Sequence, residues 1–206
     1  MDKLLKFNNK LIKSGNRIVC KKDTVDPYNP LNLPANTVRV RTTDGNPPGK
    51  FAASYETATL VPGTTDVYDV YKSGTSFRYL FWQSTNLLEV LGANTTGITD
   101  MRDAFHGCFS VTTIPLFDTR NVTTMYFMCY QCKALTSIPL FDTSKVTNMQ
   151  CTFEVCHSVE SGALALYQQV STQTTPPSNH VSTFRGCGSN TQTGAAELAQ
   201  IPDDWK

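Results

Sequence analysis

Cysteines are the residues of this chain whose spacing could do chemistry. Cys129 and Cys132 have the C-x-x-C spacing of a zinc or redox pair, and Cys151 and Cys156 follow in the sequence. A structural zinc site needs four ligands at suitable spacing, whereas Cys108, Cys132 and Cys156 simply recur every 24 residues. The total of seven is odd, which argues against a complete set of disulfides. We therefore expect most of them to be small apolar core residues with reduced thiols, and we expect no metal and no cofactor.

The histidines and carboxylates show no catalytic arrangement. His106, His157 and His180 do not share a position in the repeat, and no nucleophile-elbow sequence G-x-S-x-G occurs. Asp100, Asp103, Asp118 and Asp142 could suggest calcium, but a calcium loop needs several carboxylates at alternating spacing within about a dozen residues, and Asp118 and Asp142 are single residues in successive repeats. Turn capping is the better interpretation of the two aspartates, and exposed loop positions are the ordinary interpretation of the histidines. The sequence therefore favours a protein that is not an enzyme.

A 24-residue repeat must position all of these residues. Its markers are similar tetrapeptides ending in Met at 98–101, 122–125 and 146–149, and two copies of Ile-Pro-Leu-Phe-Asp-Thr at 114–119 and 138–143. A fixed period of roughly 20–50 residues is typical of stacked repeat architectures. Such architectures mostly present surfaces and seldom carry out chemistry.

Each unit is predicted to be a short helix followed by a strand. In 101–108 the apolar residues lie at positions i, i+3, i+4 and i+7, which is one face of a helix. Residues 135–143 fit the leucine-rich-repeat strand template, with Leu135, Ile138 and Leu140 pointing inward. The expected fold class is α/β: a leucine-rich-repeat-like solenoid of 24-residue coils, with a β-rich N-terminal cap and an N-terminal β-hairpin arm.

Phe117 and Phe141 are the candidate binding residues, because period-two alternation places Phe141 and its counterpart on the outer side of the predicted strands. Exposed aromatic side chains that polar groups surround favour a protein or a sugar partner. The alternative is that a neighbouring segment or subunit covers both rings. The predicted binding surface consists of Thr113, Pro115, Phe117, Ser137, Pro139 and Phe141.

The chain divides into three predicted parts: an anchoring arm at 1–22, a β-rich capping region at 23–73, and a repeat region with a C-terminal cap at 74–206. Apolar runs on both sides of Ser-Gly-Asn at 14–16 indicate a β-hairpin in the arm. An isolated hairpin is at best marginally stable, so it needs a partner surface. The residues predicted to anchor the arm are Leu5, Phe7, Leu11, Ile12, Ile18 and Val19.

Composition excludes several classes of partner. The chain has 206 residues, a net charge of +1 and only 17% charged residues, so nothing favours nucleic acid or an anionic membrane. No apolar stretch approaches the length of a membrane span. The first ten residues lack the uninterrupted apolar run of a secretory signal, so we expect a protein that is not exported by the usual route.

The repeat resembles a known family. Val-Thr-Asn-Met at 146–149, the Phe-x-x-Cys-x-x-Leu spacing and Ile-Pro-Leu-Phe-Asp-Thr-Ser at 138–144 resemble the BspA-like leucine-rich-repeat surface proteins. The resemblance covers about 74–187. The flanking sequences at 36–42, 162–169 and 194–202 resemble those of predicted structural proteins of phages that infect gut bacteria.

The resemblance implies one function in phages and another in bacteria, and the absence of a recognisable export signal favours the phage function. In phages it implies a virion structural protein, a head or tail fibre or decoration protein that attaches to a host-surface glycan or protein. In bacteria it implies an exported cell-surface adhesin, whose export signal this chain would lack. The phage reading further implies that the arm docks on other virion proteins and that the protein is a homo-oligomer.

Overall fold

The computed structural model describes residues 12–14, 17–19, 26–49 and 54–206. The predicted anchoring residues Leu5, Phe7 and Leu11 lie outside these ranges. Ile12, Ile18 and Val19 belong to two short strands, β1 (Ile12–Ser14) and β2 (Arg17–Val19), which pair antiparallel. Among the described helices and strands, β1 contacts only β2.

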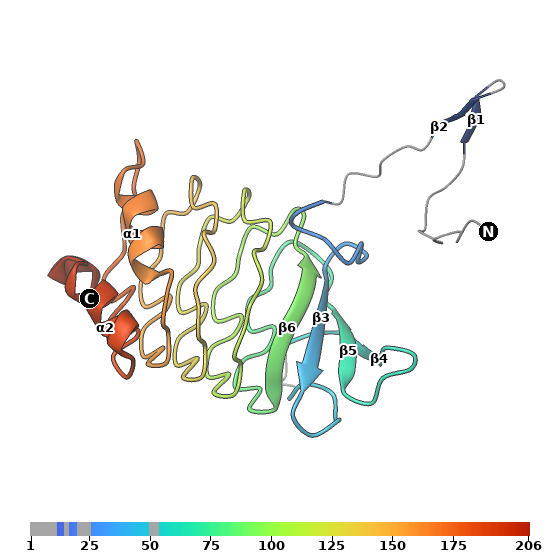
Figure 1. Cartoon of the computed structure of the whole chain (residues 1–206), viewed down its shortest axis with the longest axis horizontal. Coiled ribbons are helices and arrows are strands. Elements are labelled where there is room, and N and C mark those ends of the chain that lie inside the picture. The colour runs from blue at the N-terminus through green and yellow to red at the C-terminus, as the bar shows by residue number, and fades with distance from the viewer. Residues whose placement is uncertain (1–11, 15–16, 20–25, 50–53) are drawn as a thin grey trace, which may run out of the picture.

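A four-stranded antiparallel sheet in the order β4-β5-β3-β6 forms one end of the main body (Figure 1). Its strands are β3 (Thr37–Thr42), β4 (Thr57–Leu60), β5 (Val67–Tyr71) and β6 (Leu87–Asn94). In β3 the alternation is clear, because Val38 and Val40 are buried in the core. Arg39 between them forms an ion pair with Asp69 of β5, with Nε and Oδ1 2.7 Å apart.

Helices occur only at the opposite end of the described chain (Figure 1). They are α1 (Ala163–Ser171), α2 (Gln192–Ala199) and the 3₁₀ turn η1 (Asp203–Trp205). The side chain of Thr191 caps α2 by accepting a hydrogen bond from the amide of Gly194. None of the helices in the described ranges has the length and apolar character needed to cross a membrane.

The predicted fold class is wrong. The regular elements are the antiparallel sheet, the β1–β2 pair and the helices at the C-terminal end, and they do not form a leucine-rich-repeat-like solenoid of helix-plus-strand coils. Between Asn94 and Ala163 the described chain contains neither a helix nor a strand. The segments predicted as strands make only isolated parallel bridges, such as Glu89 with Thr113 and Ser137 with Ser161.

Four turn segments replace the predicted helices, and they comprise residues 77–84, 101–108, 125–132 and 149–156. Their backbone amides alternate between two kinds of partner. In 101–108, the amides of Ala104 and Cys108 donate within the segment to the carbonyls of Met101 and Phe105. The odd-numbered amides of 101–107 donate to carbonyls of the next segment, 124–130, at 2.8–3.1 Å. The repeat period of the sequence thus reappears as a register of hydrogen bonds between neighbouring segments.

Backbone conformation explains why these segments are not helical. Asp103 and Gly107 have φ values of 54° and 72°, as the third residue of a type II turn requires. Phe127 and Cys151, 24 and 48 residues after Asp103, have φ values of 55° and 56°. Successive four-residue turns bury positions i, i+3, i+4 and i+7, as a helix does, so the apolar pattern could not distinguish the two.

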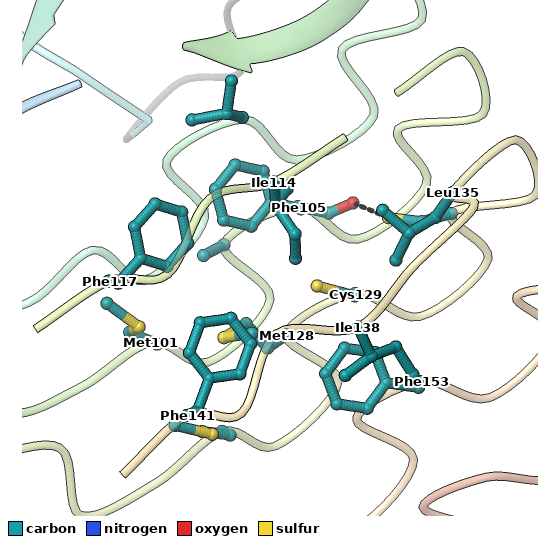
Figure 2. Close-up of a cluster of buried hydrophobic side chains, with 14 of the residues drawn as sticks. Met101, Phe105, Ile114, Phe117, Met128, Cys129, Leu135, Ile138, Phe141 and Phe153 are labelled. Carbon is teal, nitrogen blue, oxygen red and sulfur yellow. Dashed lines mark hydrogen bonds between the residues drawn. The ribbon is translucent and has the colours of Figure 1, made fainter. Parts of the chain in front are cut away.

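The core runs through the whole main body from the sheet to the C-terminus. Figure 2 shows its centre, where Phe105, Phe117 and Phe141 lie among Met and Cys side chains. Phe81 and Phe105 stack with ring centroids 5.5 Å apart, and Phe105 and Phe117 stack at 5.9 Å. Cys129 occupies the place that Phe105 and Phe153 fill in the adjoining segments, and it is completely buried.

Candidate functional site

The predicted outward orientation of Phe117 and Phe141 is wrong. Both rings are buried, with exposed fractions of 1% and 0%, and their centroids lie 5.8 Å apart. The alternative that neighbouring segments cover them is the one that the structure supports. A tight turn explains the error: the amide of Phe141 donates to the carbonyl of Pro139 at 2.9 Å, which breaks the period-two alternation. Leu140, predicted to point inward, is instead 52% exposed.

The remaining members of the predicted surface stay near solvent. Thr113 is exposed, and Pro115, Ser137 and Pro139 are partly buried. Without the two phenylalanine rings these residues offer no aromatic contact to a ligand. These residues lie on the segments 111–119 and 135–143, which we call the bridge segments because they make isolated parallel bridges. Burial of the two phenylalanine rings removes the feature that made these residues a candidate binding surface.

The cysteines are buried free thiols, as the sequence predicts for most of them. The six described ones are Cys108, Cys129, Cys132, Cys151, Cys156 and Cys187. Burial raises the pKa of Cys132 and Cys156 well above the ordinary thiol value, and it raises the pKa of Cys151 to about 12. Thiols that hold their protons this strongly are neither nucleophiles nor metal ligands at neutral pH. Among the described residues, no group of three or more His, Cys, Asp or Glu side chains could hold a metal ion.

The aspartates act in turns, as predicted. Asp142 accepts a hydrogen bond from the amide of Ser144 at 2.9 Å, and Asp118 accepts one from the amide of Arg120 at 3.3 Å. Arg120 also holds both oxygens of Asp118 through its guanidinium, and this side-chain contact lowers the pKa of the Asp118 carboxyl. Each carboxylate is thus occupied by the turn that it closes.

A strip of half-buried aromatic side chains lies on the outer side of three turn segments. We call it the aromatic strip, and its members are Tyr79, Trp82, His106, Tyr126, Phe127 and Tyr130. Trp82, His106 and Tyr130 occupy equivalent places 24 residues apart, with ring centroids 6.1 Å and 4.9 Å apart along the row. Phe127 stacks on His106 at 5.8 Å, and Tyr79 lies 5.5 Å from Trp82. The strip is one continuous run of rings at the surface.

His106 sits at the centre of the strip. Its Nδ1 lies 2.9 Å from Oδ1 of Asp103, so in the neutral tautomer Nδ1 carries the hydrogen and donates to the carboxylate. Nε2 is then left as a hydrogen-bond acceptor. The positive φ of Asp103 places its side chain where it can hold the imidazole between Trp82 and Tyr130. The prediction of an ordinary exposed loop histidine is therefore wrong for His106.

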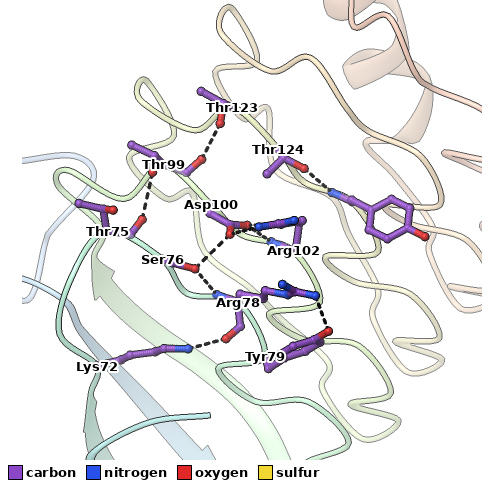
Figure 3. Close-up of polar contacts among 11 residues, drawn as sticks. Lys72, Thr75, Ser76, Arg78, Tyr79, Thr99, Asp100, Arg102, Thr123 and Thr124 are labelled. Carbon is purple, nitrogen blue, oxygen red and sulfur yellow. Dashed lines mark hydrogen bonds and ion pairs between the residues drawn. The ribbon is translucent and has the colours of Figure 1, made fainter. Parts of the chain in front are cut away.

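Polar side chains border the strip on the side of Tyr79 (Figure 3). Arg102 binds both oxygens of Asp100, and Ser76 donates to the same carboxylate at 3.1 Å. Burial raises the pKa of Asp100, but the hydrogen bonds from Arg102 and Ser76 outweigh it and leave that pKa lowered. Arg78 donates to the hydroxyl of Tyr79 at 2.7 Å. The arginines are thereby held in place next to the rings.

The row of rings ends at the fourth turn segment. Glu154 takes the place that Trp82, His106 and Tyr130 fill in the earlier segments. Its side chain is only 2% exposed and forms an ion pair with Arg185, whose side chain is 64% exposed. The strip therefore spans the segments 77–84, 101–108 and 125–132 and stops at this pair.

The sequence prediction missed the strip because it followed the buried positions of the repeat and not the half-buried positions between them. A helix would also have placed Tyr126, Phe127 and Tyr130 together on one face, since residues three and four apart are neighbours on a helix. The 24-residue register could have found the row, because it aligns Trp82, His106 and Tyr130 directly. The apolar core positions reveal the 24-residue register, and the aromatic residues of the strip occupy the half-buried positions between them.

Comparison with known proteins identifies one family. Residues 66–190 match the family model described as "Mycoplasma protein of unknown function, DUF285". Neither the search of curated proteins nor the search of solved structures gives a match. The matched residues include all three segments of the aromatic strip and the fourth turn segment that follows. They make up more than half of the 206-residue chain, so the chain belongs to the DUF285 family.

Proposed function

We propose that this protein is a non-enzymatic attachment protein that presents the aromatic strip to a glycan or protein on a host cell surface. The observation that carries the proposal is the strip itself: six half-buried rings in contact, with polar side chains at the border. Aromatic side chains with a polar atom bind well because they combine a large apolar face with a hydrogen-bonding group.

The scaffold beneath the strip supports this role. The amides of the turn segments are held alternately by bonds within a segment and bonds to the next segment. A surface held this way loses little conformational entropy on binding, which favours attachment. The six described cysteines are buried, and the carboxylates of Asp118 and Asp142 are occupied by the turns that they close. These features suit a binding surface better than a catalytic one.

We further propose that the protein is carried at the surface of a phage particle as a fibre or decoration protein. The support is the resemblance of its flanking segments to phage structural proteins and of its repeats to BspA-like surface proteins. In this proposal the segment 1–22 anchors the chain to other virion proteins, as a homo-oligomer. Deleting 1–22 is expected to abolish incorporation into particles and leave the main body folded. Particles that still contain the shortened protein would contradict the anchoring role.

A bacterial cell-surface adhesin is the second candidate. It is favoured by the description of the matched family, which refers to a bacterial genus. Fractionation separates the two candidates, because a virion protein cosediments with particles and an adhesin stays with the cell envelope. The attachment surface would be the same in both cases.

The attachment proposal is tested by binding the fluorescently labelled protein to intact cells from a panel of gut bacteria. Tyr130→Ala removes one ring from the row and is expected to reduce cell binding strongly. Leu140→Ala is the matched control, because Leu140 is an exposed apolar residue outside the strip. Equal cell binding by both variants and the original protein would show that the strip is not the attachment surface.

A further inference from the structure

We infer that the aromatic strip is a binding site for an uncharged oligosaccharide, an inference that rests on the proposed attachment function and names its ligand class. The strip offers aromatic rings in a row along three neighbouring turn segments, with Trp82 and Tyr130 edge to face with His106 and Phe127 stacked on it. A sugar chain has the same repeating form, with an apolar C–H face on each ring and hydroxyl groups around it. Stacking of sugar rings on the strip would use the faces, and the polar atoms of the strip would bind the hydroxyls.

The polar atoms of the strip fit hydroxyl groups. Nε2 of His106 is an acceptor while Nδ1 donates to Asp103. The hydroxyl of Tyr130 lies 3.4 Å from Nε2 of Gln131, and a phenol can both donate and accept. A sugar hydroxyl also both donates and accepts, so it can bind either atom. The strip thus presents donors and acceptors between ring faces instead of one kind of group.

The charges around the strip favour an uncharged ligand. Arg102 is occupied by Asp100 through two charge-assisted hydrogen bonds, and Asp103 is occupied by His106. Beyond the end of the row, Arg185 is occupied by Glu154. A phosphorylated or carboxylated ligand would have to compete with Asp100 for Arg102 and with Glu154 for Arg185. An uncharged ligand can bind without breaking any of the three pairs.

The form of the strip favours a glycan over a protein. A stable protein interface buries about 800 Å² on each partner and has large apolar anchors at its centre. Every ring of the strip is half-buried, and five of the six, all except Phe127, carry a polar ring atom or hydroxyl. A narrow row of preorganised rings suits a short linear ligand whose binding loses little entropy.

The test uses uncharged polysaccharides of bacterial, yeast and plant origin, including dextran, mannan and galactan, with hyaluronan as a charged comparison. Binding is followed by the intrinsic fluorescence of Trp82, because the chain has only two tryptophans and Trp205 is buried. We expect saturable binding to at least one uncharged polysaccharide. Tyr126→Ala and Tyr130→Ala should each weaken it roughly tenfold, about 1.4 kcal/mol, and Leu140→Ala should change it less than about twofold.

Urea unfolding of each variant shows whether it is folded, and only folded variants are compared. Binding to none of the uncharged polysaccharides, or binding that both tyrosine variants retain, overturns the inference. A second measurement separates it from the attachment proposal: cells are treated with periodate, which oxidises glycans, or with proteinase. If periodate abolishes attachment and proteinase does not, the result supports a glycan as the ligand. Strip-dependent attachment that only proteinase abolishes overturns the glycan inference and leaves the attachment function standing.

Discussion

Phe117 shows how much one buried ring contributes to this molecule. Its ring lies between those of Phe105 and Phe141, at 5.9 Å and 5.8 Å, and it is 1% exposed. Phe117→Ala removes these contacts and leaves a cavity, so it is expected to lower the free energy of unfolding by about 3–5 kcal/mol. Leu140→Ala, at an exposed position, should change it by less than about 0.5 kcal/mol. Urea denaturation measures both, and a small effect at Phe117 would mean that its ring is not buried.

The buried thiols make stability depend on alkaline pH. The folded protein raises the pKa of Cys151 to about 12 from the ordinary 9.0, and it raises the pKa of Cys108, Cys132 and Cys156 as well. Above pH about 9 the unfolded chain releases thiol protons that the folded chain still holds, so unfolding is favoured as the pH rises. We expect the free energy of unfolding to fall between pH 8 and pH 11.

The same thiols give an independent measurement. A thiol reagent at pH 8 should leave the buried cysteines of the folded protein unmodified and label them after unfolding in urea. The matched control for the pH effect is Cys151→Ser, which does not titrate in this range and should show a shallower decline of stability. Rapid labelling of the folded protein at more than one cysteine would contradict the assignment, because Cys20 lies outside the described residues.

At the scale of elements, the sequence predicted which positions are buried but not the backbone that buries them. Met101, Ala104, Phe105 and Cys108 are all buried, as the spacing indicates. Linked turns and a short helix place these four positions on the same side, so burial alone could not identify the element. The difference is in the backbone, where Asp103 and its counterparts have positive φ. No residue type in that column announces it, since the column contains Tyr, Asp, Phe and Cys and no glycine.

The prediction for the bridge segments was wrong for a related reason. The strand template for 135–143 correctly predicted that Leu135 and Ile138 are buried. Its predicted orientations were wrong for Leu140 and Phe141, because a tight turn joins Pro139 and Phe141. Proline at this place removes a backbone donor and favours a change of direction, which was the available signal. Neither of these two burial patterns could identify the aromatic strip, because its half-buried rings lie between the core positions and are aligned only by the 24-residue register.

Gly162 precedes α1 and packs closely against the backbone of Ile138 in the bridge segment 135–143. It precedes the helix with a φ of 98°, and a Cβ at this position would lie 2.1 Å from the carbonyl oxygen of Ile138. Gly162→Ala therefore combines an unfavourable conformation with a clash against backbone, and we expect it to cost about 3 kcal/mol. Gly74→Ala is the matched control, because Gly74 has a φ of 81° and open space around it. It should cost only about 1 kcal/mol. Equal costs would show that the contact with Ile138 can relax.

At the scale of the whole molecule, one core connects two different ends. Tyr55 beside the sheet lies 6.5 Å from Phe81 of the first turn segment, and Phe153 stacks on Phe184 at 6.1 Å near the last. Trp205 covers that end, with ring centroids 6.3 Å from Phe184 and 4.1 Å from His180. Its carbonyl also accepts a hydrogen bond from the amide of Phe184 at 2.9 Å. The aromatic strip thus lies on a body that is closed at both ends of its core.

Trp205→Ala tests whether this body unfolds as one unit. Removing a buried tryptophan is expected to lower the free energy of unfolding by about 3–5 kcal/mol. It also leaves Trp82, in the first turn segment, as the one fluorescent tryptophan of the chain. If the core is cooperative, the Trp82 transition in urea shifts to lower concentration together with the circular dichroism signal. If the ends are independent, Trp82 keeps its original midpoint while part of the dichroism is lost earlier. We expect the coincident shift, because buried side chains are continuous from Val38 to Trp205.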